Sequence, residues 1–227
     1  MKMMGRGALI MNEVIDRNCL SYWFQKLADD GIPVPRTKIV RWYGEPGSLL
    51  EALDGKEPVG FPTFLSSLIE AAVKVGPYPV FLRTGQGSGK HRWKDCCYIS
   101  SPDDFPQHIY NLVEWSATVD FIGLPVDVWA VREMLPTKPL AICSRYGDFP
   151  MVQEVRCFIG DGKVRCAHPY WPTQAIRDGG VPEDLLAKIA AEAQEPKLIE
   201  AAMPLAKLVA EAFAGDGSWS ADLLLTN

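Results

Sequence analysis

The residues best suited to chemistry lie in one central segment, YPVFLRTGQGSGKH, which runs from Tyr78 to His91. An apolar stretch delivers Arg83 and then opens into a loop that holds three glycines and Lys90. Glycine tolerates positive φ and lets backbone N–H groups approach an anion closely. Arginine adds a planar group with several donors, and lysine adds a compact positive charge. The segment therefore predicts a phosphate-binding loop; the alternative is a solvated Gly/Ser-rich hairpin loop with incidental basic residues.

Two familiar phosphate motifs do not fit this loop. A P-loop needs Ser or Thr after the lysine and a glycine six positions before Lys90, but the chain has His91 and Thr84 there. A dinucleotide-binding loop opens a helix, whereas this loop leads into a predicted strand over Cys96–Ile99. The loop would therefore bind phosphate in another structural setting.

The elements that must position the loop alternate between helical and strand patterns, which predicts α/β or α+β layers. Before the loop, the patterns predict helices over 9–30, 49–53 and 61–75 and strands over 38–42 and 79–83. After it, they predict helices over 103–115, 184–193 and 199–213 and strands over 96–99, 126–135 and 219–225, with a hairpin over 151–169.

The Asp161-Gly162 dipeptide in that hairpin is a strong type I′ turn signal. If Gly160 pairs with Lys163, Cys157 lies opposite Cys166, because the register of a hairpin follows from its turn. The predicted apolar face carries Val155, Cys157, Ile159, Val164 and Cys166. The predicted polar face carries Glu154, Arg156, Phe158, Lys163 and Arg165. The polar face would line a ligand site or meet water.

Composition limits the function classes. The chain has 227 residues, 48% hydrophobic content and a net charge of −5, all typical of a globular protein, and the negative charge argues against broad nucleic-acid binding. The six cysteines form no C-x-x-C pair, so no zinc ribbon is indicated. No window reaches 18 uncharged apolar residues, and the first residues lack a signal-peptide pattern. We expect a cytoplasmic protein with free thiols and no membrane association.

The chain resembles the ATP-grasp superfamily from about Tyr78 to its end. YPVFLRTGQGSGKHRWKDCCYISSPDDFPQHIYNLVE is similar to the family's strand, small-residue loop, strand and helix, with arginine where many members have lysine. VWAVREMLP resembles the hinge strand, EVRCFIGDGKVRCAHPYW the following hairpin, and SWSADLLL the strand of the first magnesium ligand. In detail the chain is most similar to phage-type ATP-grasp domains, and more distantly to those that assist assembly of a eukaryotic initiation factor. A phage-encoded protein would act in the host cytoplasm.

The resemblance implies a set of site residues and the cofactors ATP and Mg²⁺. It implies phosphate binding by Arg83, Gly87, Ser88, Gly89, Lys90 and Arg156, adenine binding by Glu133, Met134 and Leu135, a ribose or metal contact for Glu154, and a magnesium contact for Asp222. Lys90 and Arg156 would also act in catalysis, by stabilising charge on the transferred phosphate.

The resemblance also implies an α+β, ATP-grasp fold, in which two subdomains hold a nucleotide between antiparallel sheets. It places a variable, substrate-side part at 1–76, a small subdomain with the phosphate loop and hinge at 77–136, and the C-terminal subdomain at 137–227. The family's pattern continues with a further strand that carries a second acidic metal ligand. Because the sequence ends at Asn227, we expect this strand to be missing here.

The function implied first is an ATP-dependent ligase, in which a small-molecule or peptide carboxylate accepts the γ-phosphate and an amine or thiol then attacks. The alternative is a non-catalytic, nucleotide-binding assembly factor for a protein partner. A third reading, an RNA ligase, would require a K-x-D-G motif, and Lys163 follows Asp161-Gly162 in the wrong order.

Overall fold

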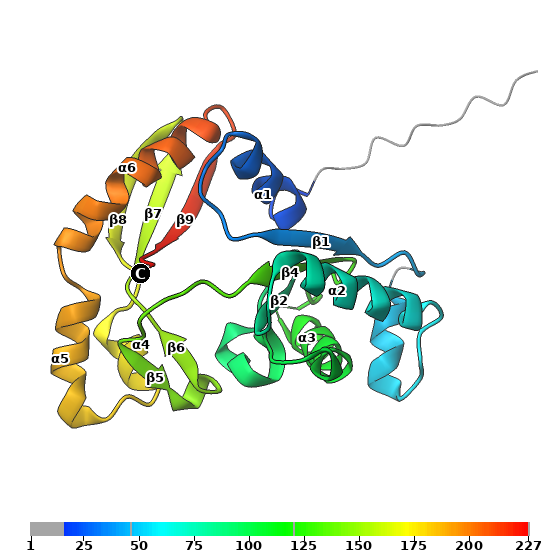
Figure 1. Ribbon diagram of the computed structural model, residues 1–227. Helices are drawn as coiled ribbons and strands as arrows, with labels where there is room; N and C mark the ends of the chain where they lie inside the picture. Colours follow the sequence, from blue (N-terminus) through cyan, green and yellow to red (C-terminus); the bar gives the residue numbers. More distant parts are fainter. Residues whose placement is uncertain (1–15, 46, 120, 227) are drawn as a thin grey trace, which may run out of the picture.

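The computed structural model describes residues 16–45, 47–119 and 121–226. Figure 1 shows these residues folded into helices and strands that alternate along the chain. The first half holds α1 (Leu20–Asp29), β1 (Thr37–Arg41), α2 (Phe61–Val75), β2 (Val80–Thr84), β3 (Tyr98–Ile99), α3 (Phe105–Thr118) and β4 (Val128–Glu133). The second half holds β5 (Ala141–Cys143), β6 (Phe149–Met151), β7 (Glu154–Gly160), β8 (Lys163–Pro169), α4 (Thr173–Asp178), α5 (Glu183–Ala193), α6 (Lys197–Ala212) and β9 (Ser218–Leu224). The predicted α+β class is confirmed.

The first lobe is built on an antiparallel sheet in the order β1-β4-β2-β3. Side chains alternate between its faces, so Leu82 and Val131 point toward the core that α2 and α3 cover, together with Trp129. Phe81 and Arg132 form the neighbouring pair and point to the opposite face. The described part of segment 1–76 contributes β1 to this sheet, next to β4, which is the predicted hinge strand.

Helix α1 covers part of that opposite face and connects it with the C-terminal lobe. Leu20 and Phe24 pack on Ala130 of β4. The other side of α1 joins a cluster with Phe213 and Trp219, which belong to the C-terminal part. Helix α1 therefore lies between this face of the sheet and the C-terminal lobe (Figure 1).

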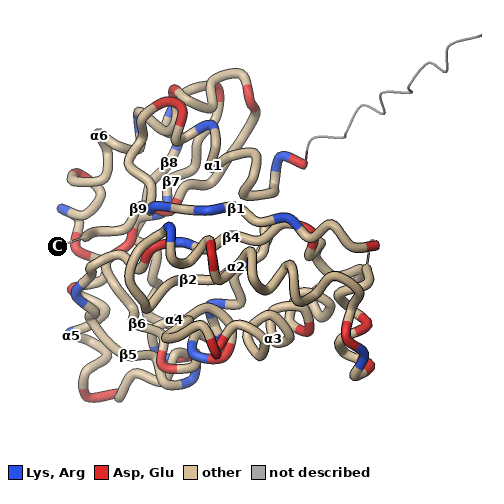
Figure 2. The backbone as a smooth tube through the Cα atoms, turned by 45° about the vertical axis from the view of Figure 1, so that its right-hand side comes forward, with Lys and Arg blue, Asp and Glu red and all other residues tan. Residues whose placement is uncertain are grey.

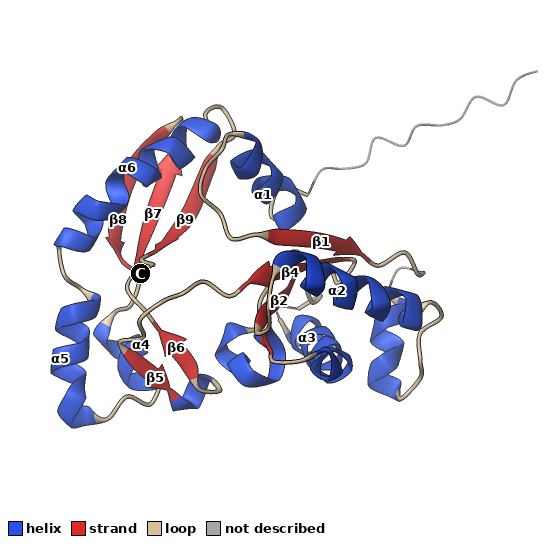
Figure 3. Cartoon of the chain, viewed as in Figure 1, coloured by secondary structure: helices blue, strands red, loops and turns tan. Residues whose placement is uncertain are grey.

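The C-terminal lobe has a second antiparallel sheet, β8-β7-β9, with α6 packed along its outer face (Figure 3). The apolar residues of β7 point toward α6, and the polar residues Glu154 and Arg156 point the other way. Its hairpin turns at Asp161 and Gly162, which both have positive φ, as a type I′ turn requires. Gly160 pairs with Lys163 as predicted.

The register predicted beyond that turn is wrong. A β-bulge shifts the pairing between Phe158 and Ile159, so Cys157 pairs with Ala167 and Cys166 pairs with Phe158. A bulge adds one residue to one strand, which moves the following side chains to the other face. Cys166 is consequently exposed while Cys157 is buried, and the pair cannot form a cross-strand disulfide.

Other predicted elements also differ from the structure. Only Tyr98 and Ile99 of the predicted strand 96–99 are extended, because Trp93–Cys97 form a π-helical turn. The hairpin β5-β6 and helix α4 were not predicted at all. The start of the helix predicted over 9–30 lies outside the described residues, and α1 begins at Leu20. In the described ranges no helix is long and apolar enough to cross a membrane.

Candidate functional site

The glycine-rich loop is bonded to its own framework. Thr84 and Gly87 exchange backbone and hydroxyl hydrogen bonds of 2.9 to 3.1 Å. The N–H of Gly85 donates to the carbonyl of Val128 at 2.7 Å, and the thiol of Cys97 donates to the carbonyl of Ser88 at 2.8 Å. These bonds leave the amides of Gly85 and Gly87 turned inward, so the loop acts as a fixed support for the residues that follow it.

The packing explains why this loop needs glycine. A Cβ atom on Gly87 would lie 2.3 Å from the ring of Trp115, and one on Gly85 would lie 2.6 Å from the sulfur of Cys19. Gly89 has a φ of +60°, a conformation that other residues adopt at a cost. At Gly85 and Gly87, close approach of neighbouring side chains is therefore the reason for glycine.

We expect Gly87→Ala to destabilise the protein by about 1–3 kcal/mol. The added methyl group would overlap the Trp115 ring, which cannot move aside as easily as the end of a flexible side chain. Urea unfolding followed by fluorescence would measure this loss. Gly160→Ala is a matched control, since its Cβ would meet other atoms only at 3.5 Å or more. Equal stability of the two variants would show that the loop is not tightly packed.

Lys90 follows the loop and lies among three aromatic rings. Its Nζ atom is 4.5 Å from the ring centroid of Tyr170, 5.6 Å from Trp171 and 5.9 Å from Phe149. A cation over an aromatic face gains electrostatic attraction. In the described part of the chain Lys90 has no ion pair, so its charge is available to a ligand.

The C-terminal sheet brings Glu154, Arg156 and Asp222 to one face. Arg156 donates from Nε and an Nη atom to the two carboxylate oxygens of Asp222, both at 2.7 Å. This bidentate bond raises the pKa of Arg156 above its ordinary value. The guanidinium also lies 4.4 Å from the centroid of Tyr170. Tyr170 thus contacts Lys90 and Arg156, two cations that come from different parts of the chain.

Glu154 is the most perturbed carboxyl group of this face. Burial raises its pKa to about 7, the charge of Lys90 lowers it and the charge of Asp222 raises it. The strand register pairs Asp222 with Arg156, two residues from Glu154 on the same face, in accord with these influences. We call Lys90, Glu154, Arg156, Tyr170 and Asp222 the interlobe site.

Arg83 lies on β2 of the first sheet, with its guanidinium 5.8 Å from the ring centroid of Trp23 on α1. Burial lowers its pKa to about 10, and the charge of Arg132 lowers it further. The charges of Arg83 and Lys90 both act on the buried thiol of Cys97, although burial dominates and raises the pKa of that thiol. The Cys97 thiol is thus a group that both Arg83 and Lys90 influence.

The hinge residues lie at the end of β4. The carboxylate of Glu133 accepts hydrogen bonds from the backbone N–H and from Nε of Arg36, both at 2.7 Å, and these bonds lower its pKa. The N–H of Glu133 in turn donates to the carbonyl of Arg36 at 2.9 Å. Met134 packs on the main core and Leu135 is half-buried. The structure thus places the side chain of Glu133 in the junction of β1 with β4.

Two residues with a place in this arrangement were missed by sequence reasoning. Tyr170 follows the predicted hairpin, and only its position after the strand that carries His168 and Pro169 could have indicated it. Arg132 is two residues from Ala130, which pairs with Arg83 across the sheet. The proximity of Arg132 to Arg83 therefore becomes apparent only from the strand register.

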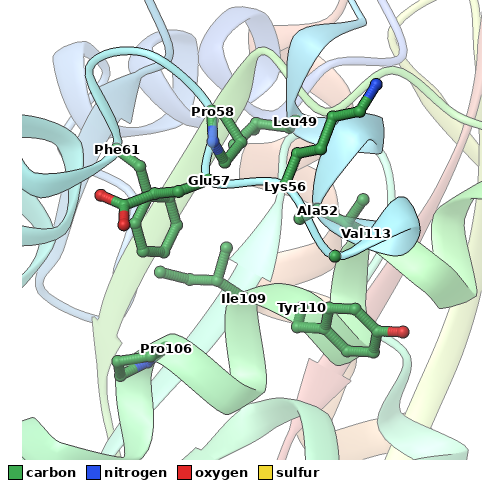
Figure 4. A pocket seen from close by; sticks show the side chains of 11 residues that line it. Leu49, Ala52, Lys56, Glu57, Pro58, Phe61, Pro106, Ile109, Tyr110 and Val113 are labelled. Carbon is green, nitrogen blue, oxygen red and sulfur yellow. The ribbon is translucent and has the colours of Figure 1, made fainter.

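An apolar pocket of about 320 Å³ lies on the helical side of the first sheet and contains none of the predicted site residues. Ile109, Tyr110 and Val113 of α3 line it from one side, and Figure 4 shows the ammonium group of Lys56 pointing away from them. With so few donors directed inward, this pocket is not suited to a triphosphate.

Charge is mixed over the surface. Figure 2 shows Lys and Arg positions interspersed with Asp and Glu positions in both lobes. The composition carries 23 basic and 28 acidic residues.

Two solved structures share the fold described above with TM-scores over 0.5. The chain is similar to C-terminally truncated Cdc123 from Schizosaccharomyces pombe, with a TM-score of 0.56, 12% identity and coverage of 93% of this chain and 79% of that one. Cdc123 from the same organism gives a TM-score of 0.54 at 13% identity, with the same coverage. An ADP complex of PurK, N5-carboxyaminoimidazole ribonucleotide synthetase, gives a TM-score of 0.46 at 13% identity, covering 92% of this chain and 41% of that one.

No curated protein matches the sequence. Residues 74–215 match the family described as ATP-grasp domain, R2K clade family 3. This match covers more than half of the chain and includes the glycine-rich loop, the hinge strand and the first two strands of the C-terminal sheet. The resemblance inferred from the sequence is confirmed: the chain belongs to the R2K clade of ATP-grasp domains.

Proposed function

We propose that this protein binds ATP at the interlobe site, with its phosphates among Lys90, Arg83 and Arg156. The observation that carries the proposal is the convergence of Lys90 and Arg156 on Tyr170, at 4.5 and 4.4 Å. Two cations from separate segments thereby face one place, where an anionic ligand would offset their mutual repulsion. Membership of the ATP-grasp family supports nucleotide binding.

The same site suits a magnesium ion. Asp222 and Glu154 lie on neighbouring strands, and their carboxylates are the hard oxygen ligands that Mg²⁺ takes, one or two at a time, with phosphate oxygens and water. In the described residues no cluster of three or more His, Cys, Asp or Glu is placed to hold a metal. The ion would therefore depend on the nucleotide for its remaining ligands. Bound there, it would neutralise phosphate charge.

For the base, we propose the hinge. The backbone groups of Met134 and Leu135 follow β4 directly and would hold the adenine edge. The carboxylate of Glu133 would shape this position through its bonds to Arg36.

We further propose that the protein is an ATP-dependent ligase acting on a small-molecule or peptide carboxylate. The carboxylate oxygen would form a bond to the γ-phosphorus as the bond to the ADP oxygen breaks. An amine or thiol would then attack the acyl carbon and release phosphate. Arg156 and Lys90 would stabilise the negative charge on the moving phosphoryl group, so that catalysis rests on positioning and electrostatics.

Titration calorimetry with a non-hydrolysable ATP analogue and Mg²⁺ tests the nucleotide site, with the GTP analogue for comparison. We expect saturable binding that favours the adenine nucleotide. A folded sample that gives neither heat of binding nor a thermal shift with either analogue would overturn the proposal.

One observation favours a second candidate, a nucleotide-binding assembly factor for a protein partner. Asp222 is held by both hydrogen bonds of Arg156, which competes with metal coordination. Nucleotide binding without ADP release, across a panel of carboxylates and amines, would support this candidate over the ligase.

Asp222→Asn separates magnesium binding from nucleotide binding. We expect the tightening of nucleotide binding by Mg²⁺ to fall about tenfold, which is about 1.4 kcal/mol, because an amide is a weaker ligand than a carboxylate. Binding without the metal should not weaken, because the substitution also loosens the hold of Asp222 on Arg156 and leaves that cation to the phosphates. Asp161→Asn, at the exposed hairpin turn, is the control. The same magnesium dependence in all three proteins would exclude Asp222 as a ligand.

A further inference from the structure

Arg132 and Arg83 are distinguished from the other arginines by their surroundings. In the described chain, arginines with a carboxylate partner are Arg17, Arg36, Arg92, Arg156, Arg165 and Arg177. Arg41 and Arg145 have no such partner but are exposed to water. Arg83 and Arg132 are both half-buried and, within the described ranges, neither lies in ion-pair distance of a carboxylate.

The hydrogen bonding of Arg132 is also incomplete, whereas Arg83 has contacts of its own. Arg83 uses Nε for a bond of 3.0 Å to the carbonyl of Thr84, and its guanidinium lies 5.8 Å from the ring centroid of Trp23 on α1. The Nε atom of Arg132 is buried and has no hydrogen-bond partner among the described residues. A buried donor without an acceptor typically costs about 1–3 kcal/mol, and more when the group is charged.

The sheet register brings the two side chains to one place. Arg83 pairs with Ala130 and Phe81 pairs with Arg132, so the arginines are diagonal neighbours on adjacent strands and share one face. Diagonal neighbours lie about 7–8 Å apart between Cα atoms, within reach of long side chains. The charge of Arg132 also lowers the pKa of Arg83, in accord with this placement.

We propose that Arg132 and Arg83 form one oxyanion-binding site on this face. Two like charges on a partly buried surface, one of them with an unpaired buried Nε, are unfavourable by themselves, and an oxyanion would interact with both at once. The anion would be one that enters with the reactants: a nucleotide phosphate or the carboxylate of a second substrate. The identity of the anion rests on the proposed function, whereas the existence of the site does not.

The test compares wild type with Arg132→Gln, and with Arg41→Gln as the control. Arg41 is on the same sheet face, also lacks a carboxylate partner, and is exposed. Each protein is titrated with inorganic pyrophosphate and with succinate, and its thermal unfolding is followed with and without pyrophosphate. We expect Arg132→Gln to bind pyrophosphate or succinate at least tenfold more weakly and to unfold no earlier than wild type without ligand. Arg41→Gln should resemble wild type.

Further titrations identify the source of the anion. If Arg132→Gln weakens binding of the ATP analogue but not of adenosine, the site holds a nucleotide phosphate. If it leaves both unchanged but weakens binding of succinate to the nucleotide-loaded protein, the site holds a carboxylate. If the protein binds pyrophosphate in an Arg132-dependent manner but does not bind nucleotides, the anion site is supported and the proposed function is overturned.

Unchanged affinity of Arg132→Gln for all of these probes would overturn the inference. So would a variant that unfolds well below wild type yet keeps its pyrophosphate affinity, because Arg132 would then be structural. If Arg132→Gln does not fold, Arg132→Met, which keeps the bulk of the side chain without polar atoms, is measured in its place.

Discussion

Lys90→Ala is expected to weaken binding of the non-hydrolysable ATP analogue at least tenfold, about 1.4 kcal/mol or more. The ammonium group of Lys90 is the cation of the loop that has no carboxylate partner in the described chain, and three aromatic rings orient it. Removing it leaves Arg156, which is already bonded to Asp222, with less support for phosphate charge. Titration calorimetry with Mg²⁺ present measures the loss.

Lys94→Ala is the matched control, because it removes a lysine four residues further along the same segment. The ammonium group of Lys94 is paired with Asp148 at 2.6 Å and is largely exposed, so its removal should leave nucleotide affinity within about twofold. Equal effects of the two substitutions would mean that general charge attracts the nucleotide. If Lys90→Ala leaves nucleotide affinity unchanged, Lys90 is not part of the nucleotide site.

Glu154→Gln is expected to stabilise the unliganded protein at pH 8 by roughly 2–3 kcal/mol, yet to change little at pH 4. Burial raises the pKa of Glu154 from 4.5 to about 7 in the folded protein. The folded state therefore binds more protons than the unfolded state between these values, and wild-type stability falls as pH rises through this window. Glutamine cannot ionise, so the variant lacks this loss.

Urea unfolding of both proteins across pH 4–8, without nucleotide or metal, measures the difference in the free energy of unfolding. Other titrating groups are shared and cancel in this difference. Glu192→Gln on the exposed face of α5 is the control and should match wild type throughout. A difference that stays constant with pH, or that grows toward pH 4, would show that folding does not raise the pKa of Glu154. A carboxylate so disfavoured in the empty protein is suited to meet a cation when ligands bind.

Several parts of the fold followed from local sequence. Helix α2 occupies the predicted range 61–75, where apolar residues recur at helical spacing and a proline stands in the first turn. The turn at Asp161 and Gly162 also follows from local chemistry, because these residue types accept positive φ. In both cases the energies that decide the structure act within a few residues.

Other parts required contacts between distant segments. The bulge that moves Cys166 to the exposed face adapts β8 to the twist and packing of its neighbours. The π-helical turn at Trp93–Cys97 replaces a predicted strand start, since Trp93 packs between Phe81 and Phe149 and Cys97 bonds to Ser88. A propensity for strand is weak beside the burial of such side chains.

The sequence by itself determined the α+β class, the order of most elements, the family, and the residue types that suit a phosphate and a magnesium ion. The tertiary structure decided how those residues meet. It directed the amides of Gly85 and Gly87 inward, placed Lys90 against Tyr170 some 80 positions away, bonded Glu133 to Arg36, and set Arg132 beside Arg83. The reason is physical: backbone preferences act between near neighbours, whereas burial, ion pairing and strand register depend on which distant segments share the same space.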